Sequence, residues 1–162
     1  MLATIQKSGT GYIARFERLL NHSVENVWSM LTDNEKLKKW FSELRVEDLR
    51  KGGIISFDMQ DGTFEEMVIT ELVMNSILEF TWAEDIVRFE LFPNADGCLF
   101  VFSEKINKIT NHTPKDLAGW HVCLDVIREL LDGRTMESRE AEWKKWYVKY
   151  VEAVEKVTEN QK

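Results

Sequence analysis

The sequence predicts an α+β fold: a curved antiparallel sheet of about six to seven strands wrapped around a long C-terminal helix, with two short helices after the first strand. Two observations predict it. Apolar residues alternate with a period of two from about residue 44 to 107, and they recur at helical spacing from residue 113 onward. Closely spaced strands with short turns indicate an antiparallel meander, and only the C-terminal helices are long enough to cover one face of it.

The first strand and the two short helices are expected within residues 12–41. Residues 12–20 alternate between apolar and charged side chains, as a half-buried strand does. Ser23 is the expected N-cap of the first helix, because its side-chain oxygen can accept a hydrogen bond from an N–H of the first turn. Thr32 and Glu35 match a capping box, which predicts a second helix that runs to Phe41.

About five or six further strands are expected, with alternating segments at residues 52–59, 64–73, 77–82, 86–92 and 98–106. Residues 82–85 and 93–97 are expected turns. The apolar run from Cys98 to Phe102 is typical of a strand covered on both faces.

Two helices are expected after the strands. Thr113 and Asp116 match a capping box, with Pro114 at the first helical position, and Gly133 is a good C-terminal stop. A second helix begins near Ser138 and carries an aromatic stripe. The simplest organisation is a single domain over residues 1–162, with residues 1–10 flexible and residues 134–162 as an additional C-terminal helical segment.

Composition limits the classes of partner. The 162 residues carry a net charge of −7, which argues against binding to nucleic acid and to anionic membrane surfaces. No apolar run approaches the roughly 20 residues of a membrane helix, so no membrane insertion is expected. The first residues lack the apolar stretch of a signal peptide, which favours a cytoplasmic location. Cys98 and Cys123 are expected to be free buried thiols, and neither a metal nor a cofactor is expected.

The segment "AGWHVCLD" (118–125) brings together three residue types that can carry chemistry. On a helix, His121 and Asp125 share a face, whereas Cys123 points elsewhere, so a His–Cys metal site is geometrically poor. The favoured interpretation is a partly buried His121 that donates a hydrogen bond to Asp125 or to a backbone carbonyl. The alternative is a His121 on a cavity wall, acting as acid or base with Asp125 fixing its tautomer.

Arg88 is the strand residue with two open interpretations. It alternates outward from Val87 and Phe89, so a surface position is favoured. If the sheet faces the other way, Arg88 is an anion clamp inside the cavity. The candidate ligand-binding residues are mostly large apolar side chains, which could equally be core: Phe57, Phe80, Trp82, Arg88, Phe89, Phe100, Trp120, His121 and Leu124.

Four segments, "VENVWSMLTDNEKLKKWF" (24–41), "LEFTWAEDIVRFELFP" (78–93), "GCLFVFSEKI" (97–106) and "AGWHVCLDVIRELLDG" (118–133), resemble the START-like (SRPBCC) superfamily, whose fold is the helix-grip fold. The branch they resemble most is the bacterial one related to the activator of the ninety-kilodalton heat-shock ATPase. The resemblance covers nearly the whole chain and implies a START-like domain with a cavity. Members of the superfamily bind lipids, hormones or secondary metabolites, and some are cyclases or hydratases. The bacterial branch offers no agreed catalytic motif to carry over.

Three functions follow as hypotheses. The first is binding of a small hydrophobic or amphipathic molecule in a cavity between the curved sheet and the C-terminal helix. The second is a cyclase- or hydrolase-type enzyme that uses His121 as acid or base, although a protein without catalysis is favoured. The third is a protein-interaction or chaperone-regulating module, with a partner bound through the aromatic-rich last helix.

Overall fold

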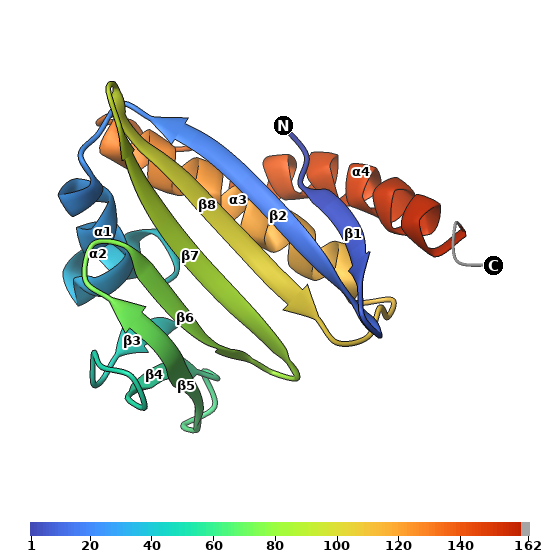
Figure 1. The fold of residues 1–162 in the computed structure, drawn as a ribbon, viewed down its shortest axis with the longest axis horizontal. Helices are drawn as coiled ribbons and strands as arrows, with labels where there is room; N and C mark the ends of the chain where they lie inside the picture. Colours follow the sequence, from blue (N-terminus) through green and yellow to red (C-terminus); the bar gives the residue numbers. More distant parts are fainter. Residues whose placement is uncertain (160–162) are drawn as a thin grey trace. The chain divides into compact units, whose positions relative to one another are not determined.

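The computed structural model describes residues 1–159 and consists of eight strands and four helices (Figure 1). The predicted α+β class is confirmed. The elements follow in this order: β1 (Thr4–Ser8), β2 (Gly11–Leu20), α1 (Val24–Thr32), α2 (Asn34–Trp40), β3 (Leu44–Val46), β4 (Ile54–Asp58), β5 (Phe64–Val73), β6 (Ile77–Trp82), β7 (Asp85–Asn94), β8 (Gly97–Ile106), α3 (Thr113–Leu131) and α4 (Arg139–Glu159).

The strands form one open antiparallel sheet in the order β1-β2-β8-β7-β6-β5-β4-β3, which fits the helix-grip fold. The strand count exceeds the expected six to seven because the sheet carries two short edge strands, β1 and β3. Strand β1 lies within residues 1–10, which were expected to be flexible. It pairs with β2 through a tight turn at Gly9, and its side chains are mostly exposed, so its sequence carries little alternation.

The chain divides into two compact units. Unit 1 contains residues 1–16 together with the residues from 105 onward, and unit 2 contains residues 17–104. Strands β2 and β8 contribute residues to both units. The single domain over residues 1–162 stays a prediction.

The helices of unit 2 begin where side chains cap them. The Ser23 side chain accepts a hydrogen bond from the Asn26 N–H, as predicted for the N-cap of α1. The predicted capping box at Thr32 and Glu35 is wrong. Asp33 caps α2 by accepting from the Glu35 N–H, and Thr32 ends α1 with its hydroxyl donated to the Trp28 carbonyl.

One face of the unit 2 strands carries its apolar core. In the β6–β7 register, Leu78 lies opposite Phe89 and Phe80 lies opposite Val87, and each of these four side chains is at most 2% exposed. The hairpin that joins β7 to β8 packs closely on the end of β2, because a Cβ at Gly97 would lie 2.4 Å from the Leu20 carbonyl oxygen. Only glycine fits this approach, and its φ of +141° also favours glycine.

In unit 1, the start of α3 is capped differently from the prediction, whereas the end of α3 and the start of α4 agree with it. Helix α3 begins at Thr113 with Pro114 in its first turn, so the predicted capping box at Thr113 and Asp116 is wrong. The Thr113 hydroxyl instead accepts a hydrogen bond from the Thr110 N–H in the preceding turn. Gly133 ends α3 at a φ of +76°, and Ser138 accepts a hydrogen bond from the Ala141 N–H at the start of α4, both as predicted.

Helices α3 and α4 pack against each other, and α4 also contacts β1. The side chains of Tyr150 and Val154 on α4 are buried in this packing, although α4 is otherwise half-buried or exposed. Within residues 1–159, none of the helices combines the length and the apolar character that a membrane crossing requires.

Candidate functional site

Five of the predicted ligand-binding residues lie on one face of the sheet in unit 2. Residues directly opposite each other in a ladder share a face, and side chains two positions apart on a strand also share it. By this rule, the β4–β5, β5–β6 and β6–β7 registers place four of the residues on one face. The ring contact between Phe89 and Phe100 adds the fifth. The residues brought together are Phe57, Phe80, Trp82, Phe89 and Phe100.

At one end of this face, three half-buried rings form a cluster that we call the aromatic trio: Phe41, Phe57 and Trp82. Each ring meets the other two edge to face, with centroid distances of 5.8 to 5.9 Å. Edge-to-face contacts are the arrangement that aromatic quadrupoles favour. Phe41 follows the last residue of α2, so the trio joins the end of a helix to two strands.

A layer of fully buried rings lies behind the trio. Phe80 is 6.5 Å from Trp82 between ring centroids, and Phe89 contacts both Phe80 and Trp40 at 6.3 Å. Three of these rings, Trp40, Phe80 and Phe89, together with five leucine and isoleucine side chains, surround a cavity of about 10 Å³ within unit 2. A cavity of that size has room for no more than about one water, and an apolar lining keeps it dry.

Arg88 lies on the opposite face of the sheet from the aromatic residues. Its guanidinium contacts the carboxylates of Glu71 at 2.7 Å, Glu79 at 2.8 Å and Glu90 at 3.4 Å. The hydrogen bond that Arg88 donates to Glu71, together with the one it donates to Glu79 and the negative charge of Glu90, raises the pKa of Arg88 above its ordinary value. Arg88 therefore points away from Phe89, as its favoured interpretation predicts, and not into a cavity as the alternative required. Its positive charge is compensated by the three carboxylates.

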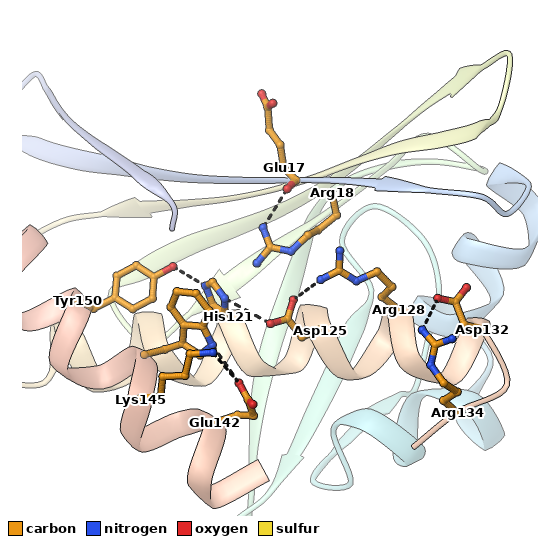
Figure 2. A network of polar contacts seen from close by, with 11 residues as sticks. Glu17, Arg18, His121, Asp125, Arg128, Asp132, Arg134, Glu142, Lys145 and Tyr150 are labelled. Carbon is orange, nitrogen blue, oxygen red and sulfur yellow. Dashed lines mark hydrogen bonds and ion pairs between the residues drawn. The ribbon is translucent and has the colours of Figure 1, made fainter. Parts of the chain in front are cut away.

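In unit 1, His121 is fully buried and both of its ring nitrogens have a partner (Figure 2). Its Nδ1 lies 2.7 Å from the Tyr150 hydroxyl on α4, and its Nε2 lies 3.3 Å from an oxygen of Asp125, one turn along α3. The same Tyr150 hydroxyl accepts a hydrogen bond of 3.0 Å from the Ala3 N–H. The His121–Asp125 proximity follows from their i,i+4 spacing, whereas the Tyr150 contact is not visible in the sequence.

These contacts favour one tautomer of His121. Because the Tyr150 oxygen already accepts from Ala3, its own proton can be donated to Nδ1 of His121, which places the imidazole proton on Nε2 facing Asp125. The Trp146 indole lies over the imidazole at 3.8 Å between centroids and 27° between planes. Within unit 1, this histidine therefore belongs to a buried network that joins α3 to α4 and, through Tyr150, to Ala3 just before β1. This agrees with the structural interpretation better than with acid–base catalysis.

Asp125 connects this buried link to a groove. The Arg128 guanidinium contacts the second oxygen of Asp125 at 3.0 Å. Both residues line a groove of about 490 Å³ between the second half of α3 and the beginning of α4. Glu129 and Glu142 are also in its lining, so the walls are mostly charged and do not suit an apolar ligand.

The last two predicted ligand-binding residues also lie in unit 1, whereas the two cysteines are divided between the units. Trp120 and Leu124 are buried on α3 and stay predictions as ligand-binding residues. Both cysteines are free and buried, as predicted, and Cys123 receives an N–H of Arg139 at 3.6 Å. Burial raises the pKa of the Cys98 thiol, which disfavours a reactive thiolate. Among residues 1–159, no three His, Cys, Asp or Glu side chains are arranged to hold a metal ion.

Two parts of these sites escaped the sequence interpretation. The sequence predicts Phe41 only as the end of a helix, and its adjacency to Trp40 does not indicate which of the two rings faces Phe57. Trp146 and Tyr150 were assigned to the stripe of the last helix. Their i,i+4 spacing indicates that both lie on one face of the helix. It does not indicate that both contact His121, as the structure shows.

The fold and the family can be compared with known proteins. A structure of a conserved protein of unknown function from Enterococcus faecalis is 27% identical, with a TM-score of 0.85, and the alignment covers 96% of this chain and 91% of that one. CalU16 from Micromonospora echinospora is 19% identical, with a TM-score of 0.69 and coverage of 94% and 95%. A protein from Staphylococcus saprophyticus is 20% identical, with a TM-score of 0.63 and coverage of 78% and 96%.

No curated protein sequence matches the chain significantly. The family described as "Activator of Hsp90 ATPase homolog 1-like protein" matches residues 21–132, which is more than half of the chain and includes every element from α1 to α3. The resemblance to the START-like superfamily is thereby confirmed at the level of family and fold, and the chain belongs to the Activator of Hsp90 ATPase homolog 1-like family.

Proposed function

We propose that the protein binds a small apolar or amphipathic molecule at the aromatic trio of unit 2. The observation that carries this proposal is the trio itself: three rings in mutual contact, all half-buried, in front of a fully buried aromatic layer. Membership of the family supports a ligand-binding or regulatory module and names no ligand.

The trio suits an apolar ligand for an energetic reason. A ligand that covers the solvent-exposed parts of these rings removes apolar area from water at about 25 cal/mol per Å². Edges and faces of the rings also provide contacts for an aromatic or a flat alicyclic ligand. The polar end of an amphipathic ligand stays in water, next to the exposed Glu65 that lies opposite Phe57 in the β4–β5 register.

Binding requires side-chain movement. The cavity of about 10 Å³ behind the trio is far smaller than the roughly 300 Å³ of a typical ligand pocket. We infer that the rings of Phe57 and Trp82 rotate away from each other when a ligand enters, and that the ligand's apolar end replaces their contact. In this proposal, the ligand binds to a minor conformation in which the rings are already apart, and binding increases the population of that conformation.

The test is a titration of isotope-labelled protein followed by NMR. The ligands are a saturated fatty acid, a sterol, a flavonoid and an aromatic acid, each added separately. We expect at least one class to give saturable shifts of the Trp82 indole N–H and of the amides of Phe41 and Phe57. We also expect Phe57→Ala to weaken that binding about tenfold, since it removes a ring contact and leaves the backbone unchanged.

Phe64→Ala is the matched control, because Phe64 neighbours the same β4–β5 hairpin but is 62% exposed on the opposite face. It should bind as the unsubstituted protein does. The proposal fails if a folded, well-dispersed spectrum shows no saturable shift with any class, or if Phe57→Ala and Phe64→Ala bind with equal affinity.

The net charge of −7 supports one further part of this proposal. We infer that the protein does not bind nucleic acid, because it lacks the excess of basic residues that a phosphate backbone requires. A cytoplasmic location is likewise a proposal, which tagging and fractionation can test.

A further inference from the structure

The face of the unit 2 strands opposite the aromatic trio carries exposed apolar side chains at one end. Met74 is 76% exposed, Leu19 72%, Val73 47% and Phe92 43%. Isolated exposed apolar residues are ordinary on protein surfaces, whereas contiguous ones indicate an interaction site. We call the set formed by Leu19, Val73, Met74, Ile77, Phe92 and Leu99 the outer patch.

The strand registers make the outer patch contiguous. Val73 lies opposite Ile77, and Ile77 lies opposite Glu90, two positions from Phe92 on the same face of β7. Strand β7 ends at Asn94 and β8 begins at Gly97, so this hairpin places Phe92 opposite Leu99.

The same geometry brings β2 to the patch. Strands β2 and β8 are neighbours, and a Cβ at Gly97 would lie 2.4 Å from the Leu20 carbonyl. Leu19 is therefore level with Leu99, and both point away from the buried face that carries Leu20 and Phe100. The outer patch thus crosses five strands, β2, β5, β6, β7 and β8, and the turn between β5 and β6.

A negatively charged cluster borders the outer patch. Glu71, Glu79 and Glu90 surround the single guanidinium of Arg88, so this group of four side chains has a net charge of −2, from three carboxylates and one cation. Glu90 lies directly opposite Ile77, which joins the cluster to the patch without a gap.

We propose that the outer patch and its acidic border bind a protein segment in which apolar side chains are flanked by Lys or Arg. Apolar contacts with Leu19, Phe92 and Met74 supply affinity, and the net negative cluster selects a basic segment. A second copy of this chain is disfavoured as the occupant, because the chain has a net charge of −7 and two copies would bring their acidic borders together.

The probe is a short synthetic peptide of Leu and Lys with its leucines at helical spacing, labelled with a fluorophore. Two control peptides replace Lys by Glu, or Leu by Ser. We expect saturable binding of the Leu/Lys peptide alone, with affinity that falls as the salt concentration rises. The combined substitution Leu19→Ser and Phe92→Ser should weaken it about tenfold or more.

Phe64→Ser is the matched control variant, since Phe64 is an exposed phenylalanine on the same face at the far hairpin of β5 and should leave binding unchanged. The proposal is overturned if the double variant binds the peptide as tightly as the unsubstituted protein, or if the Leu/Glu peptide binds equally well. It is also overturned in favour of self-association if sedimentation shows a dimer that the double variant abolishes. None of these outcomes depends on ligand binding at the aromatic trio.

Discussion

Tyr150 satisfies two buried polar groups with one hydroxyl. It accepts from the Ala3 N–H at 3.0 Å and lies 2.7 Å from Nδ1 of His121, and its side chain is fully buried. A hydroxyl in this position stabilises the unit because a buried donor or acceptor without a partner is costly.

Replacement of this hydroxyl should therefore destabilise the protein. We expect Tyr150→Phe to lower the free energy of unfolding by about 1 to 3 kcal/mol, because it leaves an amide and an imidazole nitrogen in an apolar site. Urea denaturation followed by circular dichroism measures the change. Tyr147→Phe is the control on the same helix, since Tyr147 is half-buried and stacks on Trp143 at 5.0 Å through its ring alone. Equal stabilities of the two variants would contradict the role of Tyr150.

The Cys98 thiol gives the stability a pH dependence. Burial raises its pKa above the ordinary value of 9.0, so the unfolded thiol ionises first as the pH rises. Its contribution is therefore complete below about pH 9 and is lost as the pH rises from there towards the folded-state pKa. We expect the free energy of unfolding to fall more steeply between pH 8.5 and about pH 10 in the unsubstituted protein than in Cys98→Ala. Parallel curves for the two proteins would refute this assignment.

At the scale of elements, the end of α3 depends on a left-handed residue. Gly133 has a φ of +76°, and its N–H donates to the Leu130 carbonyl, while the Arg134 N–H reaches the Glu129 carbonyl. This is the pattern of a Schellman motif, in which glycine avoids the steric cost of a side chain.

Two glycine substitutions in one helix should have opposite signs. Gly133→Ala should lower the free energy of unfolding by about 1 kcal/mol, because the left-handed conformation is sterically unfavourable for alanine. Gly119→Ala should stabilise by about 0.5 to 1 kcal/mol, because Gly119 is inside α3 and its added Cβ meets no atom within 4 Å. Thermal unfolding of both variants measures the difference, and equal shifts in midpoint would contradict the cap.

The predictability of the elements differs from that of the sites. Periodicity predicted the order of helices and long strands, because it is a local property of each segment. The capping-box motif predicted the wrong caps at Thr32 and Thr113, because another group makes the hydrogen bond at each position. Asp33 accepts the N–H at the start of α2, and the Thr113 hydroxyl accepts the Thr110 N–H.

The sites depend on pairs that are distant in the chain. The i,i+4 relation of His121 and Asp125 could be predicted, whereas Tyr150 is 29 residues from His121 and Ala3 is 147 residues from Tyr150. The grouping of Phe57 with Trp82 required the register of three strands, and the face of Arg88 required the position of its acidic partners.

At the scale of the whole molecule, β2 and β8 have residues in both compact units. Loss of either unit interrupts the ladders of the other, so the chain should unfold in one cooperative transition. Of the six tryptophans, Trp28, Trp40 and Trp82 are in unit 2, and the other three are in unit 1.

Fluorotryptophan NMR can test this cooperativity directly. With 5-fluorotryptophan incorporated, all six fluorine signals should lose their native positions at the same urea concentration. A separate midpoint for the signals of Trp120, Trp143 and Trp146 would show instead that unit 1 unfolds on its own. The probes are internal controls for each other, since all are measured in the same sample.

Unit 1 is assembled from both ends of the chain, and this matters during synthesis. Ala3 and β1 leave the ribosome before Tyr150 and α4, which they contact. At roughly 5 to 20 residues per second, the stretch from residue 105 onward takes several seconds to translate. Throughout that interval the nascent chain holds an edge strand without its helical partner. We therefore expect the nascent chain to be most prone to aggregation in the interval before α4 has been translated.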